Sequence, residues 1–128
     1  MHWGKYAIWN SYLFRAEILT KLRSGKPETL VGLSGFGDLM LTCFSSQSRN
    51  NRLGNMIAKG KTLEEAFEVI GEVVEGVPTA AEIVRLADQH KLRMPLFRAV
   101  AAILEGKLKP TDGLKMVNSK KPGREDFV

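Results

Sequence analysis

The chain has 128 residues, of which 44% are hydrophobic and 26% are charged, and its formal net charge is +5. These values are typical of a single globular domain with a mild preference for anionic partners, and they do not by themselves indicate nucleic acid. The single cysteine, Cys43, excludes an intrachain disulfide and a cysteine-based zinc site. No apolar run reaches the ~18 residues that span a bilayer, and the N-terminus lacks a signal-peptide core, so we expect a cytoplasmic protein without a membrane partner.

Residues 1–25 differ from the rest, because they hold half of the chain's ten aromatic residues. Apolar residues at helical spacing predict a helix within residues 7–23 that ends near Gly25. Such an apolar helix is typical of a surface that packs against a partner, and base stacking by its aromatic rings is the functional alternative. The basic residues of this segment are too scattered to favour nucleic acid.

A new element begins at residues 26–28, with Pro27 at an early helical position. Glycines that loosen or break a helix, or that permit close packing, follow at Gly32, Gly35 and Gly37. Residues 37–44 are apolar nearly all round, which predicts a central helix rather than a surface one.

Asp38 and Thr42 are the polar residues within this apolar segment, and they lie one turn apart on the same helical face. A buried carboxylate requires a cation or several hydrogen-bond donors. Asp38 is therefore either a member of an internal ion pair or hydrogen-bonded pair, or a group that orients a substrate hydroxyl with Thr42 beside it.

Ser48 is the predicted N-cap of a helix over about residues 49–59. The free N–H groups and the positive dipole end at a helix start suit an anion. Arg49 adds a planar, permanently charged fork that can hold phosphate through two hydrogen bonds, and Asn50 can donate and accept beside it. The alternative is an ordinary capped helix with a surface arginine.

Two capping boxes are predicted in the second half of the chain, Thr62 with Glu65 and Thr79 with Glu82. Each precedes an apolar stripe at helical spacing. His90 follows the second stripe, where a cation suits the helix dipole, so it is interpreted as a helix-end residue rather than a catalyst.

Pro95 and Pro110 begin two further predicted helices, and no segment has a convincing strand pattern. Leu96, Val100, Ile103 and Leu104 are expected to face inward in the first of these. The sequence therefore predicts an all-α domain of six to eight short helices.

Glu75 lies in the loop GEVVEG, residues 71–76, where its carboxylate can accept from ribose hydroxyls or can simply be solvated. The SGFG segment is not a dinucleotide-binding fingerprint, because it lacks the third glycine and follows no strand. The sequence contains no metal-ligand cluster and no nucleophile–base pair, so we expect no metal.

The segment GLSGFGDLMLTCFSSQSRNNRLG, followed by VVEG, resembles the C-terminal domain of bacterial NAD(P)-dependent glycerol-3-phosphate dehydrogenase. The resemblance covers about residues 27–121 and includes the M-P pair before the long helix. It implies an all-α domain of the 6-phosphogluconate dehydrogenase C-terminal-like type over residues 26–121. An aromatic-rich segment with a partial family helix, residues 1–25, precedes this domain, and a charged tail, residues 122–128, follows it.

The resemblance also implies site roles for individual residues. Asp38 and Thr42 match positions at the family's catalytic centre, and Asp38 is also a substrate-binding position. Ser48, Arg49 and Asn50 match positions that bind the phosphate end of glycerol 3-phosphate or dihydroxyacetone phosphate. The family interconverts these two compounds and thereby feeds glycerophospholipid synthesis.

Contacts to the NAD or NADP cofactor are implied for Arg49, Val73 and Glu75. The family's Rossmann domain has no counterpart in this sequence, and neither does its catalytic lysine, which lies in an L-K-N segment. We therefore expect a truncated copy or a fragment that belongs to an enzyme family but is inactive alone.

Two other hypotheses remain: a non-catalytic binding or dimerisation module, which includes a homodimer, and a small basic nucleic-acid-binding helical protein. Binding of triose phosphates would favour the dehydrogenase domain. Steeply salt-dependent binding to DNA or RNA would favour the last hypothesis.

Overall fold

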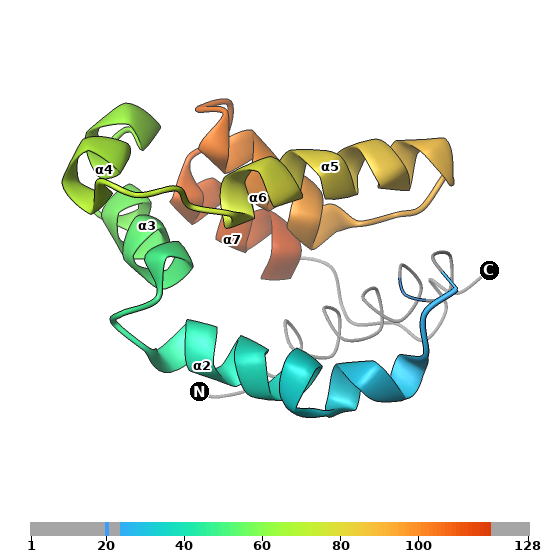
Figure 1. Cartoon of the computed structure of the whole chain (residues 1–128). Coiled ribbons are helices and arrows are strands. Elements are labelled where there is room, and N and C mark those ends of the chain that lie inside the picture. Colours follow the sequence, from blue (N-terminus) through green and yellow to red (C-terminus); the bar gives the residue numbers. More distant parts are fainter. Residues whose placement is uncertain (1–19, 21–23, 119–128) are drawn as a thin grey trace.

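The computed structural model describes residue 20 and residues 24–118, and the ordered elements among them are all helical, as Figure 1 shows. The predicted all-α class is therefore confirmed. The predicted helix within residues 7–23 and the charged tail lie outside the described residues, apart from Thr20. In chain order the elements are the 3₁₀-helix η1 (Pro27–Val31), the π-helix η2 (Leu33–Gly37), and the α-helices α2 (Asp38–Phe44), α3 (Arg49–Ala58), α4 (Leu63–Ile70), α5 (Gly76–Gln89), α6 (Pro95–Leu104) and α7 (Pro110–Asn118).

Side-chain caps fix the starts of α3 and α4. The Ser48 hydroxyl accepts from the Asn51 N–H at 3.3 Å, so the predicted N-cap of α3 is confirmed. The Thr62 hydroxyl accepts from the Glu65 N–H at 3.2 Å, and the Glu65 carboxylate accepts from the Thr62 N–H at 2.9 Å. This reciprocal pair is the predicted capping box of α4.

The second predicted capping box, Thr79 with Glu82, is wrong. Helix α5 already begins at Gly76, because Pro78 lacks an N–H and fits the first turn of a helix. Thr79 therefore lies inside the helix, where its hydroxyl donates to the Glu75 carbonyl at 2.7 Å. Glu82 accepts instead from the Arg85 guanidinium.

The main buried cluster joins α3 and α4 to the start of α5. Its fully buried members are Leu53, Ala66, Ile70 and Val74, and the partly buried side chains around them are Met56, Ile57, Leu63, Val77 and Leu104. A second buried region joins α5 and α6 through alanines, with Met94 at 1% exposure between the two helices. Val100 was expected to face inward but is 40% exposed, because the buried face of α6 carries its neighbours Ala99 and Ala101 instead.

The predicted central position of the segment over residues 37–44 is also wrong. No residue of α2 is buried, and Leu41 and Phe44 are 66% and 74% exposed. The main neighbours of α2 among the described elements are η2 and α3, so most of its circumference meets no other described helix. Gly35 does permit the expected close packing, since a Cβ at this position would clash with the Leu30 backbone.

Helix α2 runs along one edge of the molecule in Figure 1, and α3 leads from its end to α4 and then to the α5–α6–α7 group. This path brings the C-terminal end of α2 close to the starts of α3 and α5. No helix in the described part of the chain is long and apolar enough to cross a membrane.

Candidate functional site

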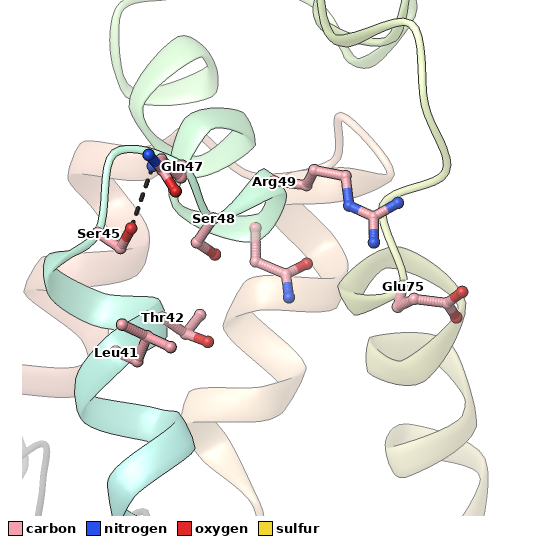
Figure 2. Close-up of a pocket in the computed structure, with 8 residues that line it drawn as sticks. Leu41, Thr42, Ser45, Gln47, Ser48, Arg49 and Glu75 are labelled. Carbon is pink, nitrogen blue, oxygen red and sulfur yellow. Dashed lines mark hydrogen bonds between the residues drawn. The ribbon is translucent and has the colours of Figure 1, made fainter.

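A pocket of about 370 Å³ lies between the end of α2, the start of α3 and the start of α5 (Figure 2). The residues that line it are Leu41, Thr42, Ser45, Gln47, Ser48, Arg49, Asn50 and Glu75. Thr42, Ser48, Arg49, Asn50 and Glu75 are site residues that the sequence predicted. The structure thus brings together residues from three helix ends that are separated by up to 34 positions in the chain.

The start of α3 supplies backbone donors to this pocket. Ser48 caps the helix by accepting from the Asn51 N–H. The N–H groups of Arg49 and Asn50 have no acceptor among the described residues, as expected for the first turn of a helix. These two donors and the positive dipole end suit a bound anion.

Asn50 links the starts of α3 and α5. Its side-chain oxygen Oδ1 accepts from the Gly76 N–H at 3.0 Å, and a Cβ at position 76 would lie only 2.5 Å from that oxygen. Glycine at position 76 therefore permits this close approach, whereas any side chain there would force Asn50 to shift. The Nδ2 group of Asn50 remains as a donor. The sequence predicted a ligand contact for Asn50 but not this structural link.

Arg49 extends from α3 toward the segment that precedes α5, as Figure 2 shows. Its Nη1 atom lies 3.3 Å from a carboxylate oxygen of Glu72, and the two side chains are 46% and 67% exposed. An ion pair at this exposure contributes about 0–1 kcal/mol to stability. Sequence reasoning missed Glu72, because nothing in the loop pattern distinguishes it from a solvated glutamate.

Thr42 and Glu75 lie on two different sides of the pocket. The Thr42 hydroxyl has no hydrogen-bond partner among the described residues and can donate to a ligand. The Glu75 carboxylate points away from Thr42 and Ser48 in Figure 2, toward the outer side of the pocket. Partial burial raises the pKa of the neighbouring Cys43 thiol, which favours its protonated form.

Three lining residues were not predicted: Leu41, Ser45 and Gln47. The Ser45 hydroxyl accepts from the Gln47 N–H at 3.2 Å, which shapes the turn between α2 and α3 (Figure 2). Ser45 and Gln47 are polar residues in a short loop before a capped helix, and this pattern could have indicated that they line the site. Leu41 gave no such signal.

Asn51 ties α2 to α3. Its Nδ2 donates to the Cys43 carbonyl at 2.8 Å, and its Oδ1 accepts from Asn55 Nδ2 at 2.7 Å. The hydrogen bond to Cys43 fixes the end of α2, and so Thr42, relative to Arg49. Sequence reasoning did not identify Asn51 or Asn55, because a link between helices cannot be read from local spacing.

Asp38 and Val73 do not line the pocket. Asp38 is exposed at the start of α2, so the prediction of a buried carboxylate with an internal partner is wrong. Asp38 is exposed because α2 as a whole buries none of its residues. Val73 is 67% exposed, whereas its neighbour Val74 is the buried residue of the loop. The described residues contain no group of three metal-binding side chains.

These features define an all-helical domain with a polar pocket at three helix ends. Residues 12–115 match the family described as NAD-dependent glycerol-3-phosphate dehydrogenase C-terminus. The chain therefore belongs to this family of C-terminal domains, and the resemblance read from the sequence is confirmed.

Relatives support the assignment over most of the chain. Glycerol-3-phosphate dehydrogenase [NAD(P)+] of Xanthomonas campestris is 45% identical over 106 residues, or 81% of this chain, and that of Aromatoleum aromaticum is 46% identical over 108 residues, or 84%. The crystal structure of glycerol-3-phosphate dehydrogenase from Coxiella burnetii superposes with a TM-score of 0.84 at 35% identity, over 91% of this chain. The chain spans 31%, 33% and 36% of these three proteins, about a third of each.

Proposed function

We propose that the pocket binds the phosphate end of glycerol 3-phosphate and dihydroxyacetone phosphate. The observation that carries this proposal is that Arg49 lines the same pocket as the start of α3, where the first N–H groups have no acceptor among the described residues. A phosphate monoester needs a charged donor and several neutral donors, and this pocket supplies both kinds. Ser48 and Asn50 add a hydroxyl and an amide N–H from the same turn.

Thr42 and Asp38 are proposed to act at the other end of the substrate. The Thr42 hydroxyl lines the pocket opposite the phosphate contacts, where it can hydrogen-bond to an oxygen of the three-carbon unit. Asp38 lies one turn earlier in α2 and is solvent-exposed. Its proposed catalytic role therefore requires a ligand that extends beyond the pocket described here.

A nicotinamide cofactor, NAD or NADP, supplies or accepts the hydride in the reaction of the named relatives. The described residues fit only an edge of such a cofactor. The exposed Glu75 carboxylate suits a sugar hydroxyl, and Arg49 suits a phosphate or carboxamide oxygen, whereas Val73 lies outside the pocket. We propose that these residues orient the cofactor and do not by themselves hold it.

We expect the 128-residue chain alone to show no dehydrogenase activity. Its sequence contains neither a dinucleotide-binding fingerprint nor the L-K-N segment that carries the family's lysine. Oxidation of NADH or NADPH in the presence of dihydroxyacetone phosphate measures this directly. Turnover above background by the pure chain would show that another residue replaces the lysine.

Calorimetric titration with glycerol 3-phosphate tests the phosphate site, with glycerol as the ligand control. Arg49→Ala should weaken binding about 10- to 100-fold or more, because it removes one or two charge-assisted hydrogen bonds of about 1.5–3 kcal/mol each. Arg49→Lys should recover only part of the affinity, since it keeps the charge but loses the planar fork. Thermal melts should barely change, because the capping oxygen belongs to Ser48 and the Glu72 ion pair is exposed.

Two outcomes would contradict the proposal. If Arg49→Ala binds glycerol 3-phosphate as the wild type does, the pocket is not the phosphate site. If Arg49→Ala unfolds the domain, Arg49 is a structural ion-pair residue and the surface-arginine alternative applies.

A homodimer is the second function we propose, and the exposed apolar side chains of η1, η2 and α2 favour it. Leu33, Leu41 and Phe44 are 91%, 66% and 74% exposed. Several large exposed apolar side chains on consecutive elements favour a protein–protein interface.

A further inference from the structure

Glu72 lies next to the pocket without lining it, and its carboxylate reaches the Arg49 side chain. Oxygen Oε2 of Glu72 is 3.3 Å from Nη1 of Arg49. No other ion pair of Arg49 occurs among the described residues. Neither the sequence pattern nor the resemblance gave Glu72 a role.

We propose that Glu72 is a built-in counter-ion that competes with an incoming phosphate for Arg49 and thereby limits how tightly the pocket binds it. This inference rests on the proposed function, which places the phosphate on Arg49. It makes Glu72 a residue that tunes affinity through Arg49, without contact to the reacting atoms.

The backbone holds Glu72 in place. Gly71 ends α4 in the left-handed conformation, with φ of 68°, and its N–H donates to the Phe67 carbonyl at 2.9 Å. Two residues after Glu72, the Val74 side chain is 2% exposed and belongs to the main buried cluster. The Glu72 carboxylate is therefore carried by a short segment that is fixed on both sides, within reach of the Arg49 side chain.

The charges of the ligand, Arg49 and Glu72 decide whether loss of Glu72 strengthens or weakens phosphate binding. A phosphate monoester carries close to two negative charges at neutral pH, so it is attracted by Arg49 and repelled by Glu72. The Glu72 ion pair also occupies one end of the guanidinium, which leaves the Nε and Nη2 edge for the ligand. If the main effect of Glu72 were to orient the Arg49 side chain for the ligand, loss of Glu72 would weaken phosphate binding. Because both side chains are well exposed, the orientation that one such contact imposes is weak, and we expect repulsion to dominate.

The test is calorimetric titration of the full chain with inorganic phosphate and with glycerol 3-phosphate at physiological ionic strength. Glu72→Gln should bind both ligands about 2- to 5-fold more tightly, in line with the weak coupling of exposed charges. The matched control is Glu68→Gln. Glu68 lies within α4, is exposed, does not line the pocket and forms no ion pair with Arg49, so its variant should bind as the wild type does.

A second comparison shows whether the effect passes through Arg49. In an Arg49→Ala background, Glu72→Gln should change the affinity much less than it does in the wild type, and the gain in the single variant should shrink as salt is added. A merely structural role for Glu72 would change the thermal melt and would not give this salt dependence.

Equal or weaker binding by Glu72→Gln, with Arg49→Ala still impaired, would overturn the counter-ion role and leave the phosphate site intact. If Arg49→Ala binds as the wild type does, or if neither the wild type nor Glu72→Gln binds phosphate, the proposed function itself fails.

Discussion

Asn50 joins two helices through its side-chain oxygen and is also proposed to contact the ligand. Because a backbone N–H only donates, the atom that faces Gly76 must be the amide oxygen, and the amide nitrogen is left for another acceptor. Arg49 likewise divides its donors between Glu72 and the pocket. The start of α3 thus contributes mainly donors to the pocket, and donors are what a phosphate would require.

Asn50→Asp separates the two roles of Asn50. The new carboxylate can still accept from the Gly76 N–H and is favoured at the start of α5 by about 0.3–1 kcal/mol, so the melting temperature should be unchanged or slightly higher. Binding of glycerol 3-phosphate should fall about tenfold or more, because a donor is lost and a negative charge is added. Calorimetry and a thermal melt on the same sample measure both effects. Wild-type affinity in Asn50→Asp would mean that Asn50 is only a structural link.

The helices position the site by their ends. Thr42 belongs to the last turn of α2, Arg49 to the first turn of α3, and Glu75 directly precedes α5. Asn50 ties α3 to α5, and Asn51 ties α3 to α2. The geometry of the pocket therefore depends on two asparagine side chains rather than on the buried cluster alone.

Asn51→Ala tests the link between α2 and α3. It removes the hydrogen bond to the Cys43 carbonyl, an exposed contact that contributes about 0.5–1.5 kcal/mol. We expect a small fall in melting temperature and a several-fold loss of glycerol 3-phosphate affinity, because Thr42 is no longer held relative to Arg49. Asn55→Ala is the control, since it leaves the bond between Asn51 and Cys43 in place. Equal effects of the two variants would argue against a specific role for this link.

The sequence predicted most of the helices, because helix caps and proline positions depend only on residues close together in the chain. The Ser48 cap and the box of Thr62 and Glu65 depend on residues at most three apart, and both were confirmed. Asp38 was predicted to be buried because its neighbours are apolar, yet burial depends on which other elements surround α2. The contacts of Asn51 and Glu72 join separate elements, so no local pattern contains them.

At the scale of the whole molecule, the described residues divide into a packed part and an exposed apolar edge. Helices α3 to α6 share the buried clusters, whereas α2 and the segment before it bury no side chain. The relatives are about three times as long as this chain. The pocket lies where the two parts meet.

The exposed edge leads us to expect concentration-dependent self-association. Leu33→Ser and Phe44→Ser should each lower it, because both side chains are largely exposed and neither lines the pocket. Sedimentation velocity over a range of protein concentrations measures the change. A wild-type chain that stays monomeric at high micromolar concentration would contradict this expectation, as would variants that associate like the wild type.

The central claim is that a phosphate monoester binds at the start of α3. An NMR titration of the ¹⁵N-labelled chain with glycerol 3-phosphate, and separately with glycerol, tests it most directly. The account predicts that the largest amide shifts fall on residues 48–51, with smaller shifts at Thr42 and Gly76, and that glycerol causes none of them. Shifts that are largest elsewhere on the molecule, or that glycerol reproduces, would contradict it.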